Sequence, residues 1–163
     1  MEIVNVRIDE RLVHAQVAAV WASTLNATKI VVVDDGASQD EIQQVALKMA
    51  CPKTVKLSII SAKRAAEKLL EEPSDSQDRL FIVMKGVKTL KKISDCGYIF
   101  PEVNIGNLSA KEDGVSLKRS VTLNQEQMDI ILELNKKGTK FTSQLVPTEE
   151  KIDLVKLIKE KAQ

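Results

Sequence analysis

The sequence predicts an α/β protein with an open, mostly parallel seven-stranded sheet and helices on both faces. Short apolar runs of strand length alternate with longer segments in which apolar residues recur at helical spacing. Some runs, such as the one at residues 29–33, are apolar almost throughout, which is typical of parallel strands covered on both faces. The 163 residues, 44% of them apolar, contain no repeat or linker, so residues 1–163 are expected to form a single domain.

Seven strands and the helices between them are predicted in chain order. The strands are expected at residues 3–8, 29–33, 55–60, 80–84, 103–105, 121–123 and 141–146. The first helix is predicted from the helical spacing of Val13, Val17, Val20, Trp21 and Leu25. The second is expected to begin with a capping box, with Ser38 at the cap and Glu41 three residues later, and to end before Pro52.

The remaining helices are predicted from apolar spacing and from residues typical of helix ends. One runs through residues 69–70, and a shorter one is expected to end near Gly97. Asn124 is expected to cap a longer helix that stops at Gly138. The last helix is expected to open at residues 148–150.

The junction between the first strand and the first helix is the most promising site. In sheets of this kind, ligands bind beyond the carboxyl ends of the strands, where the strand order reverses. This rule directs attention to segments 9–16, 34–38 and 106–110. His14, the only histidine, lies where the first helix begins, and the free N–H groups and dipole of a helix start favour an anion.

Residues around His14 suit phosphoryl transfer. A neutral imidazole nitrogen can attack phosphorus, and the protein then has mainly to position and neutralise the transferred group. Arg7 and Arg11 can donate paired hydrogen bonds to phosphate oxygens, Asp9 can hold the far ring nitrogen or orient an arginine, and Gln16 supplies an amide. The alternative is that His14 is an ordinary surface or capping residue. The many paired charges at the expected ligand edge favour a functional residue.

Asp34 and Asp35 form a second candidate feature, because they directly follow the apolar run at residues 31–33. A strand that ends in two acids resembles the acidic pocket of phospho-aspartate receiver domains. In those domains, however, the pair follows the first strand and a further aspartate follows the third, and here neither holds. Asp34 and Asp35 are therefore either loop acids near a helix start or supporting residues beside His14.

Composition excludes several classes of function. The net charge of +1 and the 3% content of aromatic residues argue against a nucleic-acid partner. There is no apolar stretch long enough to span a bilayer and no signal peptide at the N-terminus, so a cytoplasmic location is expected. Cys51 and Cys96 form no metal-binding spacing with His14. The glycine-rich nucleotide-binding motifs and the GxSxG motif are absent, so neither a metal nor another cofactor is predicted.

Residues 7–17 closely resemble a family signature, RIDDRLIHGQV. This is the signature of enzyme IIB in the mannose/fructose/sorbose class, which includes N-acetylgalactosamine, of the bacterial sugar phosphotransferase system. Weaker matches follow in the same order along almost the whole chain, at residues 31–35, 40–41, 49–52, 104–107, 138 and 144–147.

The resemblance implies a seven-stranded, mainly parallel sheet and a relay function. A phosphohistidine IIA protein would donate its phosphoryl group to Nδ1 of His14. His14 would then phosphorylate a hexose or amino sugar during transport by the IIC and IID membrane subunits, with which this cytoplasmic protein would associate peripherally. Arg11 matches the arginine that helps to hold the phosphoryl group and is therefore a catalytic residue by resemblance. Arg7, Asp9 and Gln16 match other positions of the signature.

Two departures from the signature stand out. Glu10 replaces the usual second aspartate, which is a mild change, and Ala15 replaces the glycine that follows the histidine. A glycine needed for a positive φ would make Ala15 a source of strain, whereas at a helical position alanine would strengthen the helix start. The second outcome is the expected one.

The resemblance leaves the partners and the sugar partly open. Because the first strand begins at the start of the chain, IIA is expected on a separate chain. Mannose, fructose, sorbose and N-acetylgalactosamine all remain candidates as the sugar. An alternative function is a regulatory module that is phosphorylated at His14 but passes nothing to sugar.

Overall fold

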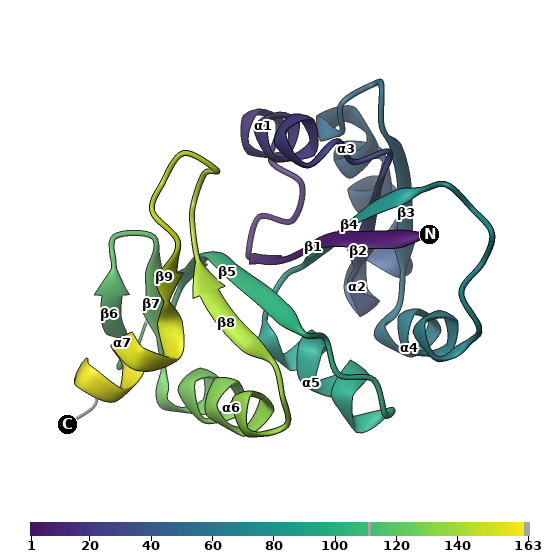
Figure 1. Ribbon diagram of the computed structural model, residues 1–163. Coiled ribbons are helices and arrows are strands. Elements are labelled where there is room, and N and C mark those ends of the chain that lie inside the picture. Colours follow the sequence, from purple (N-terminus) through teal and green to yellow (C-terminus); the bar gives the residue numbers. More distant parts are fainter. Residues whose placement is uncertain (111, 162–163) are drawn as a thin grey trace.

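The computed structural model describes residues 1–110 and 112–161, which form nine strands in one sheet and seven helices (Figure 1). Five parallel strands make up the centre, in the order β3-β2-β4-β1-β5. Their bounds are Glu2–Asp9 for β1, Lys29–Val33 for β2, Lys56–Ile60 for β3, Arg79–Met84 for β4 and Glu102–Ser109 for β5. The predicted fold class is confirmed, and the carboxyl end of β1 lies between those of β4 and β5.

Beyond β5 the sheet divides. The first part of β5 pairs with β8 (Lys140–Ser143), and its last two residues pair with β7 (Val121–Leu123), in both cases in parallel. Two short antiparallel strands, β6 (Val115–Lys118) and β9 (Ile152–Asp153), complete the sheet beside β7 and β8. All seven predicted strands are present, but the count of seven is corrected to nine. These two strands have only four and two residues, too few to show a strand pattern in the sequence.

The central strands are buried on both faces, and alternate side chains enter two separate hydrophobic clusters. Ile30 and Val32 of β2 pack with residues of α1 (Ala15–Leu25) and α3 (Glu41–Ala50). Val31 and Val33 point the other way, towards a larger cluster under four helices. These helices are α4 (Ala62–Leu70), α5 (Val87–Asp95), α6 (Gln125–Lys136) and α7 (Leu154–Lys161). Helices therefore cover both faces, as predicted, because a parallel strand must bury both of its sides (Figure 1).

Several predicted helix ends are confirmed. Asn124 caps α6 in a full capping box, in which its side chain accepts from the Gln127 N–H and the Gln127 side chain accepts from the Asn124 N–H. Gly138 follows this helix with a φ of +117°, and Gly97 follows α5 with a φ of +108°. Both glycines adopt the left-handed conformation that ends helices at little cost.

Two predicted helix starts are wrong. Ser38 is the last residue of the short helix α2 (Asp35–Ser38), and the cap of α3 is Asp40. The last helix opens at Leu154 and not at residues 148–150, because Ile152 and Asp153 first pair with β8. In both places a capping pattern in the sequence lies next to a second short element that only the folded chain reveals.

Removing the Asp40 cap is expected to destabilise the protein. The Asp40 carboxylate accepts hydrogen bonds from the N–H groups of Ile42 and Gln43 at 3.0 and 3.1 Å. Asp40→Ala should therefore lower the free energy of unfolding by about 1 kcal/mol in urea titrations. Asp40→Asn keeps an acceptor and should retain most of the stability. Equal losses in the two variants would contradict the assignment of Asp40 as the cap.

Candidate functional site

The sheet brings two of the three candidate segments together. Because β1 and β5 are neighbours, the loop after β1 reaches the end of β5. The Glu10 N–H donates to the Asn107 carbonyl at 3.0 Å, and the Glu10 carboxylate accepts from the N–H and the hydroxyl of Ser109 at 3.2 and 2.6 Å. Segments 9–16 and 106–110 are thus joined. Segment 34–38 follows β2, which is separated from β1 by β4.

His14 is the residue that precedes the first helix. Its φ and ψ of −106° and 121° are those of an extended N-cap, and its carbonyl accepts the first helical hydrogen bond, from the Ala18 N–H. The side chain is exposed and makes no capping hydrogen bond. The imidazole is therefore accessible from solvent, beside the first turn of α1, where backbone N–H groups lack partners within the helix.

Asp9 binds the two arginines of this junction. Its carboxylate accepts three hydrogen bonds from Arg11, from the backbone N–H, Nε and Nη2, each at 3.0 Å. The same carboxylate accepts from Nη2 of Arg7 at 3.2 Å. Asp9 is 1% exposed and Arg7 2%, whereas the Arg11 side chain is 35% exposed. Of the two roles predicted for Asp9, the structure places it as the residue that orients an arginine.

The charges of these three residues support one another. Burial by itself raises the pKa of Asp9, but the hydrogen bonds from Arg11 and the charges of both arginines outweigh it and hold the pKa below its usual value. Burial lowers the pKa of Arg7, partly offset by Asp9. The hydrogen bond to Asp9 raises the pKa of Arg11. The carboxylate is thus ionised and pairs with two guanidinium groups, of which the one on Arg11 reaches the surface.

Arg7 and Gln16 lie on opposite sides of this arrangement. The Arg7 guanidinium points inward, donates to the carbonyls of Gln144 and Leu145 at 2.9 and 3.0 Å, and stacks over the Trp21 ring at 5.3 Å. Gln16 is exposed in the first turn of α1. Arg7 is therefore placed to support the site from behind, and Gln16 lies on the same surface as His14.

The loop between Asp9 and His14 contains one residue with a positive φ, and it is not Ala15. Leu12 has a φ of +60°, is buried, and donates its N–H to the Asp9 carbonyl at 2.9 Å. This backbone conformation costs a non-glycine residue on the order of 1 kcal/mol. The burial of the Leu12 side chain holds the residue in it. Ala15 is the first residue of α1. The alanine therefore costs no backbone strain and favours the helix start, as expected.

Asp34 and Asp35 are engaged in structural contacts. The Asp34 side chain caps α2 by accepting from the Ala37 N–H at 2.9 Å. The Asp35 carboxylate accepts from the Ala62 N–H at 2.9 Å and pairs with Lys92 at 2.8 Å, which ties α2 to α4 and α5. The hydrogen bond from Lys92 holds the pKa of Asp35 below its usual value. These contacts correspond to the loop-acid alternative, and they place the pair on the far side of β4 from β1.

Comparison with known proteins identifies the family. A family model described as the PTS system sorbose subfamily IIB component matches residues 3–163. The chain belongs to this family. A Streptococcus pyogenes protein named "probable phosphotransferase enzyme IIB component" is 35% identical over 162 residues, covering 96% of this chain and 99% of that protein. Membership makes the chain a component of phosphotransferase-system sugar transport, whose chemistry is phosphoryl transfer.

A solved structure and a second relative extend the comparison. The IIB domain of the sorbose permease from Klebsiella pneumoniae has a TM-score of 0.88 and 26% identity, and the match covers 98% of both chains. The mannose-specific EIIAB component of Escherichia coli is 22% identical over 93% of this chain but 47% of its own length. The two proteins are named for different sugars, sorbose and mannose.

The inner side of the site in this IIB component is formed by residues whose role there is not indicated by the sequence. They are Trp21, Gly106, Gln144 and Leu145. Residues 104–107 and 144–147 match segments of the family, and this was the available signal, but it gives no role to any single side chain. The roles of Gln144 and Leu145 depend on contacts with residues 124 to 138 positions away, and that of Gly106 depends on the pairing of β1 with β5.

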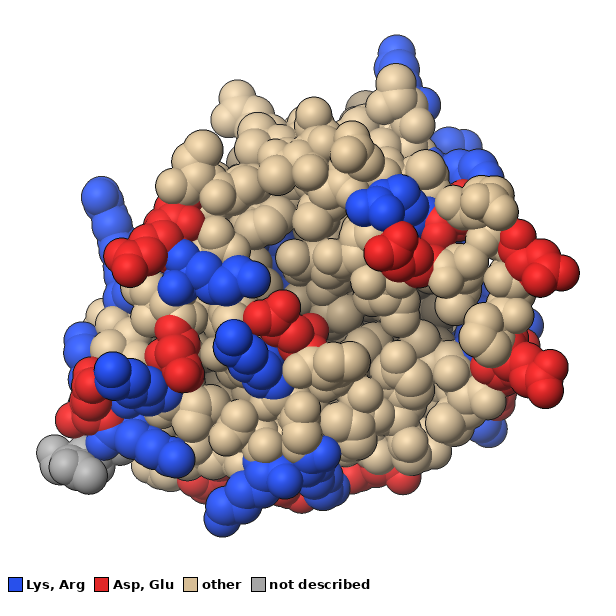
Figure 2. All heavy atoms as spheres, viewed as in Figure 1, with Lys and Arg blue, Asp and Glu red and all other residues tan. Residues whose placement is uncertain are grey.

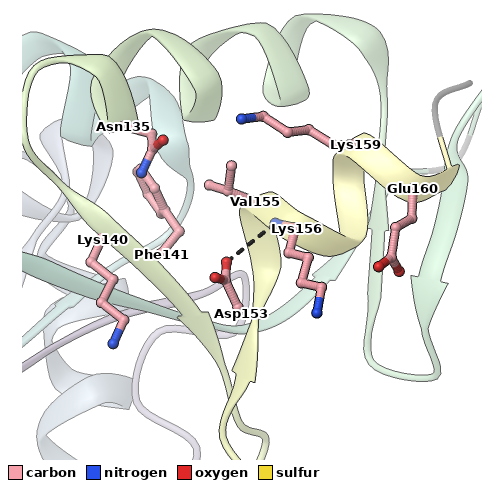
Figure 3. Close-up of a pocket in the computed structure, with 8 residues that line it drawn as sticks. All are labelled: Asn135, Lys140, Phe141, Asp153, Val155, Lys156, Lys159 and Glu160. Atoms are coloured by element: carbon pink, nitrogen blue, oxygen red, sulfur yellow. Dashed lines mark hydrogen bonds between the residues drawn. The ribbon is translucent and has the colours of Figure 1, made fainter.

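A pocket elsewhere on this IIB component is not part of the site. It has a volume of about 470 Å³ and lies between α6, β8 and α7, where Lys140, Lys156 and Lys159 are among the residues that line it (Figure 3). None of the predicted site residues lines it. Among the described residues, no three His, Cys, Asp or Glu side chains gather as a metal site, and no helix is long and apolar enough to cross a membrane.

Proposed function

We propose that this IIB component is a phosphocarrier whose His14 accepts a phosphoryl group from a phosphorylated IIA protein and passes it to a sugar. The observation that carries the proposal is the position of His14. Its exposed imidazole precedes α1 in the same loop as Arg11, whose guanidinium is fixed by the buried Asp9 carboxylate. Transfer of a phosphoryl group between two proteins requires an exposed nucleophile with a fixed positive charge close to it.

In the first step, a nitrogen lone pair of His14 attacks the phosphorus of the donor phosphohistidine. The new N–P bond forms as the donor N–P bond breaks, and the donor ring leaves with the electron pair. Over the whole step one proton moves from the His14 ring to the donor ring. Arg11 uses Nε and Nη2 to hold Asp9, so Nη1 remains for an oxygen of the phosphoryl group.

In the second step, the oxygen of a sugar hydroxyl attacks the phosphorus on His14. The N–P bond breaks, the imidazole takes the hydroxyl proton, and the sugar leaves as its phosphate ester. The acceptor is a hexose or amino sugar carried by the IIC and IID membrane subunits. We therefore place the protein in the cytoplasm, peripherally associated with that membrane complex.

The surface beside His14 supports a protein as the donor. Helix α1 contains no charged residue, and the surface above it is almost uncharged in Figure 2. Ile42, Val45 and Met49 of the neighbouring α3 are 85%, 60% and 82% exposed. Protein interfaces typically have a centre that is poor in charged residues and rich in apolar ones. The name of the EIIAB relative, which joins IIA and IIB, agrees with IIA as this partner.

The test is phosphorylation from labelled phosphoenolpyruvate with the upstream phosphotransferase proteins and a IIA protein. We expect one labelled site, acid-labile and base-stable as for phosphohistidine, which peptide mapping assigns to His14. His14→Gln should lose the label completely while keeping its circular dichroism spectrum. Undiminished labelling of His14→Gln would contradict the proposal.

A second measurement separates sugar phosphorylation from regulation. Labelled protein is mixed with membrane vesicles that contain IIC and IID, with and without each candidate sugar. We expect the label to appear as sugar phosphate with one of them. A label that stays on the protein with every sugar would instead favour the regulatory alternative.

A further inference from the structure

Three segments far apart in the sequence converge on the buried side chain of Arg7. Arg7 itself lies in β1, two residues before Asp9. Residues 104–107 belong to β5, the neighbouring strand, and residues 144–147 follow β8. The Arg7 guanidinium donates hydrogen bonds to Asp9 and to the carbonyls of Gln144 and Leu145. It also lies against Gly106, where a side chain would otherwise be.

Gly106 makes room for this guanidinium. A Cβ atom added at Gly106 would lie 2.2 Å from Cζ of Arg7 and 2.3 Å from both Nη atoms, which is far inside van der Waals contact. Because the guanidinium is already bound on its other sides by Asp9 and two carbonyls, it cannot turn away without losing hydrogen bonds. The guanidinium can therefore occupy this position only because residue 106 has no side chain.

Further hydrogen bonds hold the loop that begins at Gln144, so the carbonyls that bind Arg7 are fixed in place. The Asn104 side chain donates to the Gln144 carbonyl and accepts from the Gln144 N–H, at 3.1 and 2.8 Å. Nε1 of Trp21 donates to the Leu145 carbonyl at 3.0 Å, and the Glu149 carboxylate accepts from the Leu145 N–H. These four hydrogen bonds keep the two carbonyls turned towards Arg7.

We infer that Arg7 is a positioning residue for phosphoryl transfer, because it fixes the Asp9 carboxylate from the inside and Asp9 in turn fixes Arg11. This inference rests on the proposed function of His14. Oδ2 of Asp9 accepts from Nη2 of both arginines, so its orientation depends on the inner one. While Nη1 of Arg11 binds a phosphoryl oxygen, Asp9 stays paired with both arginines, and Arg7 is the counter-ion that holds this buried carboxylate from the inside.

Gly106→Ala tests the inference without altering a charged residue. The added methyl group displaces the Arg7 guanidinium, and through Asp9 it disturbs Arg11. We expect kcat for phosphoryl uptake from phospho-IIA to fall on the order of 10-fold to 100-fold. KM for phospho-IIA should stay unchanged, because Gly106 and Arg7 are buried behind the surface that meets the partner. The matched control is Gly86→Ala, where an added Cβ has no atom within 4 Å.

A double-mutant cycle shows whether the effect passes through Arg11. If it does, Gly106→Ala should change kcat little in an Arg11→Met background. A merely structural role would lower the midpoint of thermal unfolding and leave kcat per folded molecule unchanged. Normal kcat in folded Gly106→Ala, or an equal loss in both backgrounds, would overturn the inference.

Trp21→Phe gives a second test should Gly106→Ala not fold. It keeps an aromatic ring under Arg7 but removes the hydrogen bond to the Leu145 carbonyl, and a smaller fall in kcat is expected with the same dependence on Arg11. Normal kcat in this variant would count against the inference. Wild-type protein is labelled at His14 in parallel. Absence of that label would refute the proposed function, whereas a normal label with normal variants would refute the role of Arg7 alone.

Discussion

Asp9→Ala is expected to lower the free energy of unfolding by about 3–5 kcal/mol. The substitution removes the only carboxylate that pairs with Arg7 in the structure described for residues 1–110 and 112–161, and Arg7 is 2% exposed. A buried guanidinium without a counter-ion is costly, and its two carbonyl partners do not neutralise it. The backbone N–H of Arg11 also loses its acceptor, so the loop before His14 loosens.

Urea unfolding followed by circular dichroism measures this effect. Asp75→Ala is the matched control, because Asp75 is an exposed aspartate in the loop before β4, and it should change the stability by less than about 0.5 kcal/mol. A loss in Asp9→Ala no greater than in this control would show that the buried ion pair contributes little to the fold.

Arg11→Met is expected to slow phosphoryl uptake by His14 on the order of 100-fold to 1,000-fold, the usual effect of removing one donor that stabilises developing negative charge. The fold should persist, because Asp9 keeps its bond to Arg7 and to the backbone N–H of residue 11. Lysine should restore only part of the rate, since an ammonium group cannot bind Asp9 and a phosphoryl oxygen with a planar fork.

Rapid-quench measurement of labelled protein gives the rate. Arg64→Met, on α4 on the opposite face of the sheet, removes an exposed arginine that makes one loose ion pair with Glu67 at 3.4 Å, and it should transfer at the wild-type rate. Equal rates for Arg11→Met and Arg64→Met would mean that Arg11 does not act on the phosphoryl group.

Much of the fold could be predicted because its signals are local. The run at residues 29–33 indicates a doubly covered strand by itself, and the capping box at Asn124 lies within four residues of sequence. The predictions that were wrong concern Ser38 and residues 148–150, where two patterns of similar strength compete. At residues 148–150 the choice depends on whether β9 pairs with β8, and at Ser38 it depends on whether residues 35–38 form a short helix of their own. A local pattern carries no information about either.

The candidate site divides in the same way. The outer part, from Asp9 to His14, is a single short loop. The sequence alone therefore placed a histidine, an arginine and a carboxylate together at one end of a predicted strand. The sequence did not indicate which way Arg7 points. In β1 it lies on the face opposite Val6 and Ile8, and only the packing of Trp21 over that face buries it.

The sequence by itself determined the α/β class, the position of seven strands and the place of His14 at the start of a helix, because periodicity and capping act over a few residues. Only the tertiary structure decided that Arg7 supports the site from within, that Gly106 must lack a side chain, and that Asp34 and Asp35 serve the packing of α2, α4 and α5. Apart from the local cap that Asp34 makes on α2, these roles depend on contacts across 27 to 138 residues. The pairing of β1 with β5 and of β5 with β8 creates those made by Arg7.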